Sequence, residues 1–430
     1  MSVVEADLTW TGEGFERGVQ VEIGPDGRIG AVGRLGRSAD RRLRSRALLP
    51  GLISAHSHAF QRGLRGRGER FPEGSGSFWT WRQAMYGLVE SLSPERFRAI
   101  CLKSFLEMRD AGITAVGEFH YLHHARERQD FVFDRLVLEA AAEAGIRIAL
   151  LSTCYRTGGI GRPLEPAQRR FATPSDPAFW ESVDRLVEEL DPSLQSVGVA
   201  AHSLRAVPLE AIVGLHEETA RRGLVFHVHV AERQQEVDAC LAEYGRPPLA
   251  LLCEALPVDA RFTAVHASRA EPAELKRLIA DGGNLCLCPL TEANLGDGIL
   301  DLAPVAGAAP ADLCLGTDSN ARISMVEEMR WLEYGQRLAT RSRGVLAERG
   351  DAARELLKIA TLGGARSLGV DAGAIVSGRR ADFAALDLAA PALADLDEES
   401  LLAGWIFGGG NSAVAETCVG GRWRSRGAPV

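Results

Sequence analysis

The stretch ALLPGLISAHSH, residues 47–58, runs from an apolar segment into two histidines, and it is the first of eight similar runs along the chain. The other runs are also short and apolar, and most of them end on polar residues. They are ITAVGEFH (113–120), RIALLSTCY (147–155), SVGVAAHS (196–203), LVFHVHVAE (224–232), FTAVHAS (262–268), NLCLCPL (284–290) and DLCLGTDS (312–319). Strands that alternate with helices build a parallel sheet, and eight repeats of this unit predict an α/β fold, a closed (β/α)₈ barrel.

The segments between several of these runs have the periodicity of amphipathic helices. SPERFRAICLKSFLEMRDAG, residues 93–112, places its apolar residues on one helical face. Ser93 has the side chain of a good N-cap, and Gly112 can adopt the left-handed conformation that ends many helices. The segment therefore predicts a helix between the first two barrel strands.

Both ends of the chain show a different rhythm, in which apolar and polar residues alternate. Residues 19–33, VQVEIGPDGRIGAVG, contain a Pro-Asp-Gly turn between two such segments. ADFAALDL (381–388) and AVAETCVGGRWR (413–424) repeat the pattern near the C-terminus. We expect the two ends to meet in a small β-sandwich domain that flanks the barrel. The predicted division is 1–47 and 371–430 for this domain, and 48–370 for a metal-dependent catalytic barrel.

The composition excludes several classes of protein. The 430 residues carry a net charge of −8, which gives no general reason to bind nucleic acid. No apolar run approaches the roughly 20 residues that span a membrane, and the first residues lack the basic and apolar parts of a signal peptide. Eight cysteines without a C-x-x-C pair argue against a disulfide framework. We therefore expect a cytoplasmic protein with no nucleic-acid or membrane partner.

Polar side chains end five of the predicted strands, and barrel enzymes place their sites at these strand ends. These side chains are His56, His58, His202, His229, Glu232, His266 and Asp318. Two histidines at positions i and i+2 of a strand face the same side, so His56 and His58 can bind one ion. With His229 and Asp318 they offer three nitrogens and one oxygen, a set that suits Zn²⁺ or a similar divalent ion and leaves room for water.

Strand periodicity cannot choose between His227 and His229, because both face the same side of the run 224–232. We favour His229 as the ligand because it lies nearer the end of the strand, and we expect His227 to be buried and hydrogen-bonded. Glu232 lies three residues beyond His229, so the strand must end or bulge if both side chains serve one site.

The stretch VGEFHYLHH, residues 116–124, is a second candidate metal site because it holds His120, His123 and His124 beside a glutamate. The four ligands already named weaken that interpretation, so we expect these histidines to shape the pocket wall or to form hydrogen bonds within their loop. The C-x-C pair at residues 286–288 also resembles a metal-binding motif. Small apolar side chains that fill the barrel are the favoured interpretation of that pair.

Four motifs, in their order along the chain, resemble the amidohydrolase superfamily in its metal-dependent deaminase branch: PGLISAHSH (50–58), HVHVAE (227–232), VHAS (265–268) and GTDS (316–319). Longer motifs closely resemble formimidoylglutamate deiminases of histidine degradation: SHAFQR (57–62), SFWTWR (77–82), VGEFHYLHH (116–124), LCPLTEANLGDG (287–298) and SNARISMVEEMRWLEYGQRL (319–338). The resemblance covers nearly the whole chain. It implies a hydrolase that acts on a linear amidine and converts N-formimino-L-glutamate to N-formyl-L-glutamate and ammonia.

The resemblance also implies a role for each residue of the site. One divalent ion per chain, usually zinc, would be held by His56, His58, His229 and Asp318. Asp318 would also act as the base on water, Glu232 would protonate the imine nitrogen, and His266 would polarise the attacking hydroxide. The residues implied to contact the carboxylate and amide groups of the substrate are Gln61, Arg82, Tyr121, His202 and Arg205.

The number of ions can be argued from the lysines. Superfamily members with two metals often bridge them with a carboxylated lysine. This chain has no lysine between Lys103 and Lys276, so the predicted strands two to six cannot supply one. We therefore expect a single ion, and a glutamate or cysteine bridge is the remaining route to a second.

Two other functions stay open at this point. The first is another deaminase of the superfamily, acting on a nucleobase such as guanine or adenosine, or on a guanidino acid. A small dicarboxylate amidine needs arginines in fork geometry, whereas a nucleobase pocket would use aromatic stacking and amide-like donors. The second is a non-catalytic barrel stabilised by its metal. By analogy with proteins of this fold we also expect a homodimer.

Overall fold

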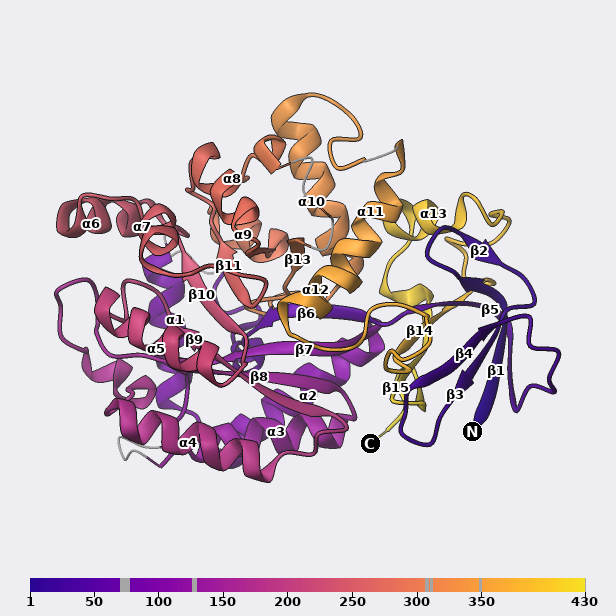
Figure 1. Cartoon of the computed structure of the whole chain (residues 1–430), viewed down its shortest axis with the longest axis horizontal. Helices are drawn as coiled ribbons and strands as arrows, with labels where there is room; N and C mark the ends of the chain where they lie inside the picture. The colour runs from indigo at the N-terminus through magenta and orange to yellow at the C-terminus, as the bar shows by residue number, and fades with distance from the viewer. Residues whose placement is uncertain (70–77, 126–129, 306–308, 310–311, 348–349, 430) are drawn as a thin grey trace.

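The computed structural model describes residues 1–69, 78–125, 130–305, 309, 312–347 and 350–429. Its strands form two separate sheets of eight strands each. One sheet is the barrel with its surrounding helices, and the other lies to one side of it, where indigo N-terminal strands and yellow C-terminal strands run side by side (Figure 1). The expected combination of a barrel and a flanking β domain built from both chain ends is therefore confirmed.

The barrel strands are neighbours in sequence order, and every pair between them is parallel. They are β6 (Leu52–Ser57), β7 (Ile113–His120), β8 (Arg147–Cys154), β9 (Gln195–Ala201), β10 (Phe226–Val230), β11 (Phe262–His266), β12 (Asn284–Leu287) and β13 (Leu313–Leu315). Backbone hydrogen bonds join the segments that follow the last and first strands. The His58 amide donates to the Asp318 carbonyl (2.8 Å), and the Asp318 amide donates to the His56 carbonyl (3.0 Å). The ring of strands thus closes through candidate site residues.

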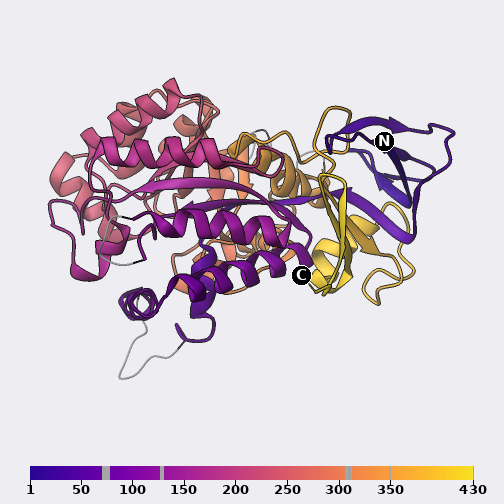
Figure 2. The ribbon, with the colours of Figure 1, turned by 90° about the horizontal axis from the view of Figure 1, so that it is seen from below.

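Helices cover the outside of the barrel (Figure 2). They are α1 (Phe78–Glu90), α2 (Pro94–Asp110), α3 (Val132–Ala144), α4 (Asp176–Glu189), α5 (Leu209–Arg221), α6 (Gln234–Tyr244), α7 (Pro248–Ala255), α8 (Pro272–Ala280), α9 (Pro289–Leu295), α10 (Met325–Thr340), α11 (Ala352–Lys358), α12 (Gly364–Ser367) and α13 (Leu401–Gly408). In α2 the Ser93 side chain accepts from the Arg96 amide, as predicted for an N-cap. Gly112 follows the helix with a φ of +88°. Within the described residues, no helix has the length and apolar content to cross a membrane.

The flanking sheet joins the two ends of the chain through β5. Its strands are β1 (Ser2–Trp10), β2 (Phe15–Glu16), β3 (Gln20–Ile23), β4 (Ile29–Gly33), β5 (Arg41–Pro50), β14 (Phe383–Asp387), β15 (Val414–Val419) and β16 (Arg422–Ser425). β5 pairs in parallel with β1 and antiparallel with β14. Residues of both ends then share one apolar cluster, in which Val4, Ile29 and Leu48 pack with Phe383 and Cys418.

One boundary differs from the expectation. The first apolar run predicts one strand from residue 47, but residues 47–50 belong to β5 of the flanking sheet, and the barrel begins at Leu52. Gly51 separates the two strands. A Cβ at this position would overlap the Thr114 side chain, so only glycine lets the chain pass closely from one sheet to the other. The domain limits 1–47, 48–370 and 371–430 stay a prediction.

Candidate active site

A cavity of about 450 Å³ lies at the C-terminal ends of the barrel strands. It brings together residues that are far apart in the sequence. Its lining includes ten of the eleven predicted site residues, namely His58, Gln61, Arg82, Tyr121, His202, Arg205, His229, Glu232, His266 and Asp318. The eleventh, His56, is fully buried directly beside them. Parallel strands of a closed barrel bring their ends to one rim, which explains this convergence.

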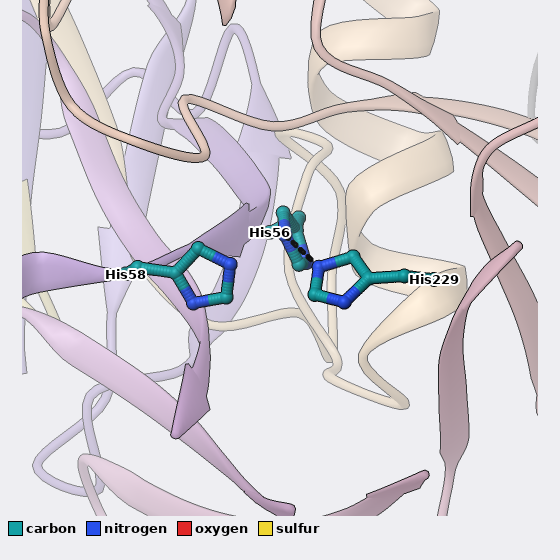
Figure 3. Close-up of side chains that lie close together, drawn as sticks. All are labelled: His56, His58 and His229. Carbon is teal, nitrogen blue, oxygen red and sulfur yellow. Dashed lines mark hydrogen bonds between the residues drawn. The ribbon is translucent and has the colours of Figure 1, made fainter. Parts of the chain in front are cut away.

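Three imidazole rings converge from two strand ends (Figure 3). His58 Nδ1 donates to the Phe119 carbonyl (2.8 Å), and His229 Nδ1 donates to the His202 carbonyl (2.9 Å). A carbonyl oxygen can only accept, so both rings carry their proton on Nδ1 and present an unprotonated Nε2. The Nε2 of His229 lies 3.1 Å from the Nε2 of His56. The backbone carbonyls of Phe119 and His202 therefore orient the Nε2 lone pairs of His58 and His229 toward one point.

Asp318 completes this set. Its Oδ1 lies 3.2 Å from His58 Nε2 and 3.4 Å from His56 Nε2. Burial lowers the pKa of His58 to about 3 and the pKa values of His56 and His229 well below the usual range, so the three imidazoles are neutral. Neutral imidazole is the form that binds metals. Three nitrogens, one carboxylate oxygen and two fixed tautomers fit a divalent ion.

Glu232 reaches the cavity because the strand before it ends. β10 stops at Val230, and Ala231 has a φ of +50°, so the period-two alternation is broken between His229 and Glu232. This is the break that the spacing required. Left-handed backbone is uncommon for non-glycine residues, and here it also occurs at His266 (φ +70°) and Asp318 (φ +43°). Such conformations cost energy and occur often at functional sites.

An arginine holds the carboxylate of Glu232. Arg205 Nη2 donates to Glu232 Oε2 (2.9 Å), and Arg205 Nε lies 3.6 Å from Glu236 Oε2. Burial alone would raise the pKa of Glu232, but the charges of Arg205, His266 and Arg233 outweigh it and lower the pKa. Arg205 was expected to contact substrate, and its pairing with Glu232 was not expected. The pairing joins two side chains of the cavity lining that come from different strand ends.

His266 ends β11 between two carboxylates. Its Nε2 lies 3.7 Å from Asp318 Oδ2, and its Nδ1 lies 3.3 Å from Glu292 Oε1. Burial disfavours the charged ring, but the hydrogen bond with Glu292 and the charges of Glu232 and Asp318 outweigh it and raise the pKa to about 10. His266 therefore lies where it can interact with Asp318 and with a molecule in the cavity.

The remaining predicted residues line the same cavity. Gln61 Nε2 donates to the Tyr121 hydroxyl (2.8 Å), which leaves the hydroxyl proton of Tyr121 available to another acceptor. Arg82 Nε donates to the Tyr86 hydroxyl (2.6 Å), and His202 Nδ1 lies 3.2 Å from Ser203 Oγ. Of the motif SFWTWR, Ser77 lies outside the described residues.

The histidine-rich stretch 116–124 is a network behind the wall of this cavity. His120 Nε2 and His123 Nδ1 both contact Asp134 Oδ1, at 3.0 and 2.9 Å, and His124 Nε2 donates to the Ala172 carbonyl (2.9 Å). Tyr121 is the residue of this stretch that lines the cavity in the described part of the chain, so the three histidines can shape the pocket wall only from behind it. One hydrogen bond lies within the loop, as expected, because His124 Nδ1 accepts from the Phe131 amide (3.2 Å), whereas the bonds to Asp134 and Ala172 leave the loop.

Two structural interpretations from the sequence also hold. His227 is buried, and its Nε2 donates to the Ser367 carbonyl (2.9 Å). Cys286 and Cys288 are buried in a small cluster with Cys314 and two aliphatic residues, as expected for barrel fillers. Sequence reasoning missed Glu236 and Glu292. Glu236 follows Glu232 at helical spacing, and Glu292 lies inside the motif LCPLTEANLGDG, but neither signal identifies a partner by itself.

Comparison with known proteins gives consistent results. The model described as "Amidohydrolase family" matches residues 47–424. A formimidoylglutamate deiminase from Pseudomonas aeruginosa is 40% identical over 435 residues, covering 98% of this chain and 94% of the relative. A 5-methylthioadenosine/S-adenosylhomocysteine deaminase from Natronomonas pharaonis is 29% identical, covering 92% and 85%.

A solved structure that is also similar in sequence has the same fold. The crystal structure of an amidohydrolase from Brucella melitensis has a TM-score of 0.88 and 33% identity, covering 99% of this chain and 95% of that one. The family match spans nearly the entire barrel and reaches into the flanking sheet. The chain therefore belongs to the amidohydrolase family, whose members are metal-dependent hydrolases.

Proposed function

We propose that the protein hydrolyses N-formimino-L-glutamate to N-formyl-L-glutamate and ammonia, a reaction of histidine degradation. The observation that carries this proposal is that one cavity combines the His/Asp cluster with four arginines, among them the predicted Arg82 and Arg205. Arginine is the side chain best suited to bind carboxylates, and this substrate has two. The full-length similarity to a formimidoylglutamate deiminase supports the same substrate.

The ion is proposed to be one Zn²⁺ per chain, held by His56, His58, His229 and Asp318. Three imidazoles and one carboxylate match the ligands that zinc prefers. A divalent ion in this position lowers the pKa of a water molecule toward neutrality, so that hydroxide is available at physiological pH.

The protein's own groups then move the protons. The two carboxylate oxygens of Asp318 face different partners. Oδ1 faces the Nε2 atom of His58, and Oδ2 faces the Nε2 atom of His266. Oδ2 is therefore the atom that takes a proton from the attacking water, and His266 Nε2 orients the attacking oxygen. Glu232 protonates the imine nitrogen, which makes the formimino carbon more electrophilic. When the carbon–nitrogen bond breaks, the proton held by Asp318 passes to the departing amine, which leaves as ammonia, and Glu232 regains a proton from the hydroxyl that becomes the formyl oxygen.

Arg205 couples substrate binding to this acid. A substrate carboxylate beside Arg205 compensates the guanidinium charge that otherwise keeps Glu232 ionised. Binding of the correct substrate therefore favours the protonated form of Glu232 that the reaction needs. Gln61, Tyr121 and His202 supply further hydrogen bonds to the amide and carboxylate groups.

Replacing Arg205 with alanine is expected to raise KM and to lower kcat. A charge-assisted hydrogen bond contributes about 1.5–3 kcal/mol, so the change in kcat/KM should reach about 10–100-fold. Steady-state ammonia release measures both constants, and Arg185→Ala, an exposed arginine on α4, is the control. Unchanged constants in Arg205→Ala would remove Arg205 from the substrate site.

The function itself is tested with a substrate panel. Ammonia release is compared for N-formimino-L-glutamate, guanine, adenosine, 5-methylthioadenosine and a guanidino acid, using zinc-loaded protein. We expect turnover of N-formimino-L-glutamate to exceed the others by orders of magnitude. Turnover of a nucleobase or nucleoside with none of N-formimino-L-glutamate would replace the proposed substrate, and no turnover of any compound would favour a non-catalytic barrel.

A further inference from the structure

Glu292 lies behind His266, outside the set of residues that line the cavity in the described chain. It belongs to the first turn of α9 and is 7% exposed. Its Oε1 lies 3.3 Å from His266 Nδ1, whereas His266 Nε2 lies 3.7 Å from Asp318 Oδ2. The two ring nitrogens thus have different carboxylate partners, one behind the cavity and one in its lining. Among the predicted site residues, the one that Glu292 contacts with a hydrogen bond in the described chain is His266.

The carboxylate of Glu292 is itself fixed in place. Its Oε1 also accepts from the backbone amide of Cys288 (2.9 Å), the residue that precedes α9. Its backbone carbonyl accepts from the Asp297 amide (2.8 Å). A side chain that is buried and bonded to the start of its own helix has little freedom, so it can serve as a rigid reference for the imidazole.

The imidazole packs against two other imidazole rings, and contacts of this kind depend on the shape of the ring more than on where its nitrogens lie. His266 lies parallel to His229, with ring centroids 5.5 Å apart and 14° between the planes, and it meets His56 edge-on at 5.9 Å. A half-turn about Cβ–Cγ preserves the shape of the ring but exchanges Nδ1 and Nε2 with carbon atoms. A carboxylate that accepts only from an N–H excludes the turned orientation.

We propose that Glu292 is a positioning residue for His266: it accepts the Nδ1 proton and thereby directs Nε2 at Asp318 and the reacting oxygen. The geometry of the pair is independent of the substrate, whereas its kinetic consequence rests on the proposed function. Partners that orient an active-site imidazole in this way typically contribute about 10–100-fold to activity.

The first test compares Glu292, which lies on α9, with a second buried glutamate that contacts α9 from outside. Glu292→Gln is expected to lower kcat by about 10–100-fold and to change KM by less than about 2-fold. Glu328→Gln is the matched control, because Glu328 is buried and its Oε2 accepts from the Leu290 amide of α9 (2.9 Å), not from an imidazole. Burial raises the pKa of Glu328 well above the usual range, and glutamine has nearly the same shape. Equal effects of the two substitutions would overturn the proposal.

A double-mutant cycle separates positioning from general damage. In a His266→Ala background, Glu292→Gln should cause no further loss of kcat, because the ring that it orients is gone. The same fold-loss in both backgrounds would show that Glu292 acts on the fold and would refute the proposal. Zinc content, measured by elemental analysis, is expected to stay at the wild-type value in Glu292→Gln.

A spectroscopic readout keeps this test separate from the substrate assignment. In ¹⁵N-labelled zinc-loaded protein, the His266 signal, assigned by its loss in His266→Ala, should show a proton on Nδ1. That signature should persist in Glu328→Gln and change in Glu292→Ala. An unprotonated Nδ1 in the wild-type protein would overturn the proposal even if N-formimino-L-glutamate is hydrolysed. Failure of the wild-type protein to hydrolyse it would refute the proposed function and leave the ring measurement decisive for Glu292.

Discussion

Glu232→Gln is expected to reduce ammonia release by about 10²–10⁴-fold while the protein keeps its fold and its metal. Glutamine has nearly the same shape and can still accept from Arg205, but it cannot deliver a proton to the imine nitrogen. Glu232 lies outside the proposed ligand set, so the zinc content should not change. The measurements are kcat for N-formimino-L-glutamate, the zinc-to-protein ratio and the thermal unfolding midpoint.

The control for this substitution is Glu243→Gln, an exposed carboxylate on α6, the helix that follows Glu232. It should leave kcat within about 2-fold of the wild type, as is usual for surface changes. Near-normal turnover in Glu232→Gln would mean that another group protonates the imine. Loss of zinc in the same variant would instead assign Glu232 to the metal site. The two results are distinguishable in one preparation.

The sequence could locate the barrel because its strands are buried on both faces and stand out as short apolar runs. Residues 113–120 were expected as a strand, and β7 occupies that range. The convergence of His56 and His58 could also be predicted, because the period of a strand places them on one side whatever surrounds them. The missed boundary at Gly51 has the same origin. When an apolar run continues from one sheet into another, no residue pattern within the run shows where the first strand ends and the second begins.

The partners of the site residues could not be predicted, because they depend on how separate elements pack. His120 and His123 meet Asp134, which lies on α3, and Arg205 meets Glu232 from another strand end. Neither pairing has a period or a motif of its own. The histidine density of residues 116–124 was therefore ambiguous, and three-dimensional contacts were needed to assign it to a structural network.

Removal of the metal is expected to abolish turnover and to lower thermal stability, and added zinc should restore both. Electrostatic stabilisation by a metal is worth several kcal/mol, which corresponds to about 10²–10⁴-fold in rate. Zinc at about 1,000 times its dissociation constant should stabilise the folded chain by about 4 kcal/mol. The Nε2 atoms of His56 and His229 lie 3.1 Å apart in a buried site, where one ion can bind both. Activity and unfolding midpoints after dialysis against a chelator measure both effects.

The two histidines of β10 provide a matched pair for this prediction. His229→Gln should remove the zinc-dependent rise in the unfolding midpoint, because its Nε2 points at the cluster. His227→Gln should keep that rise, because His227 lies on the same strand and the same side but donates to the Ser367 carbonyl. Both variants lose a buried hydrogen bond, so their absolute midpoints can fall alike. Only the difference between zinc-loaded and zinc-free protein separates them, and a zinc-dependent rise in His229→Gln but not in His227→Gln would reverse the assignment of the third ligand.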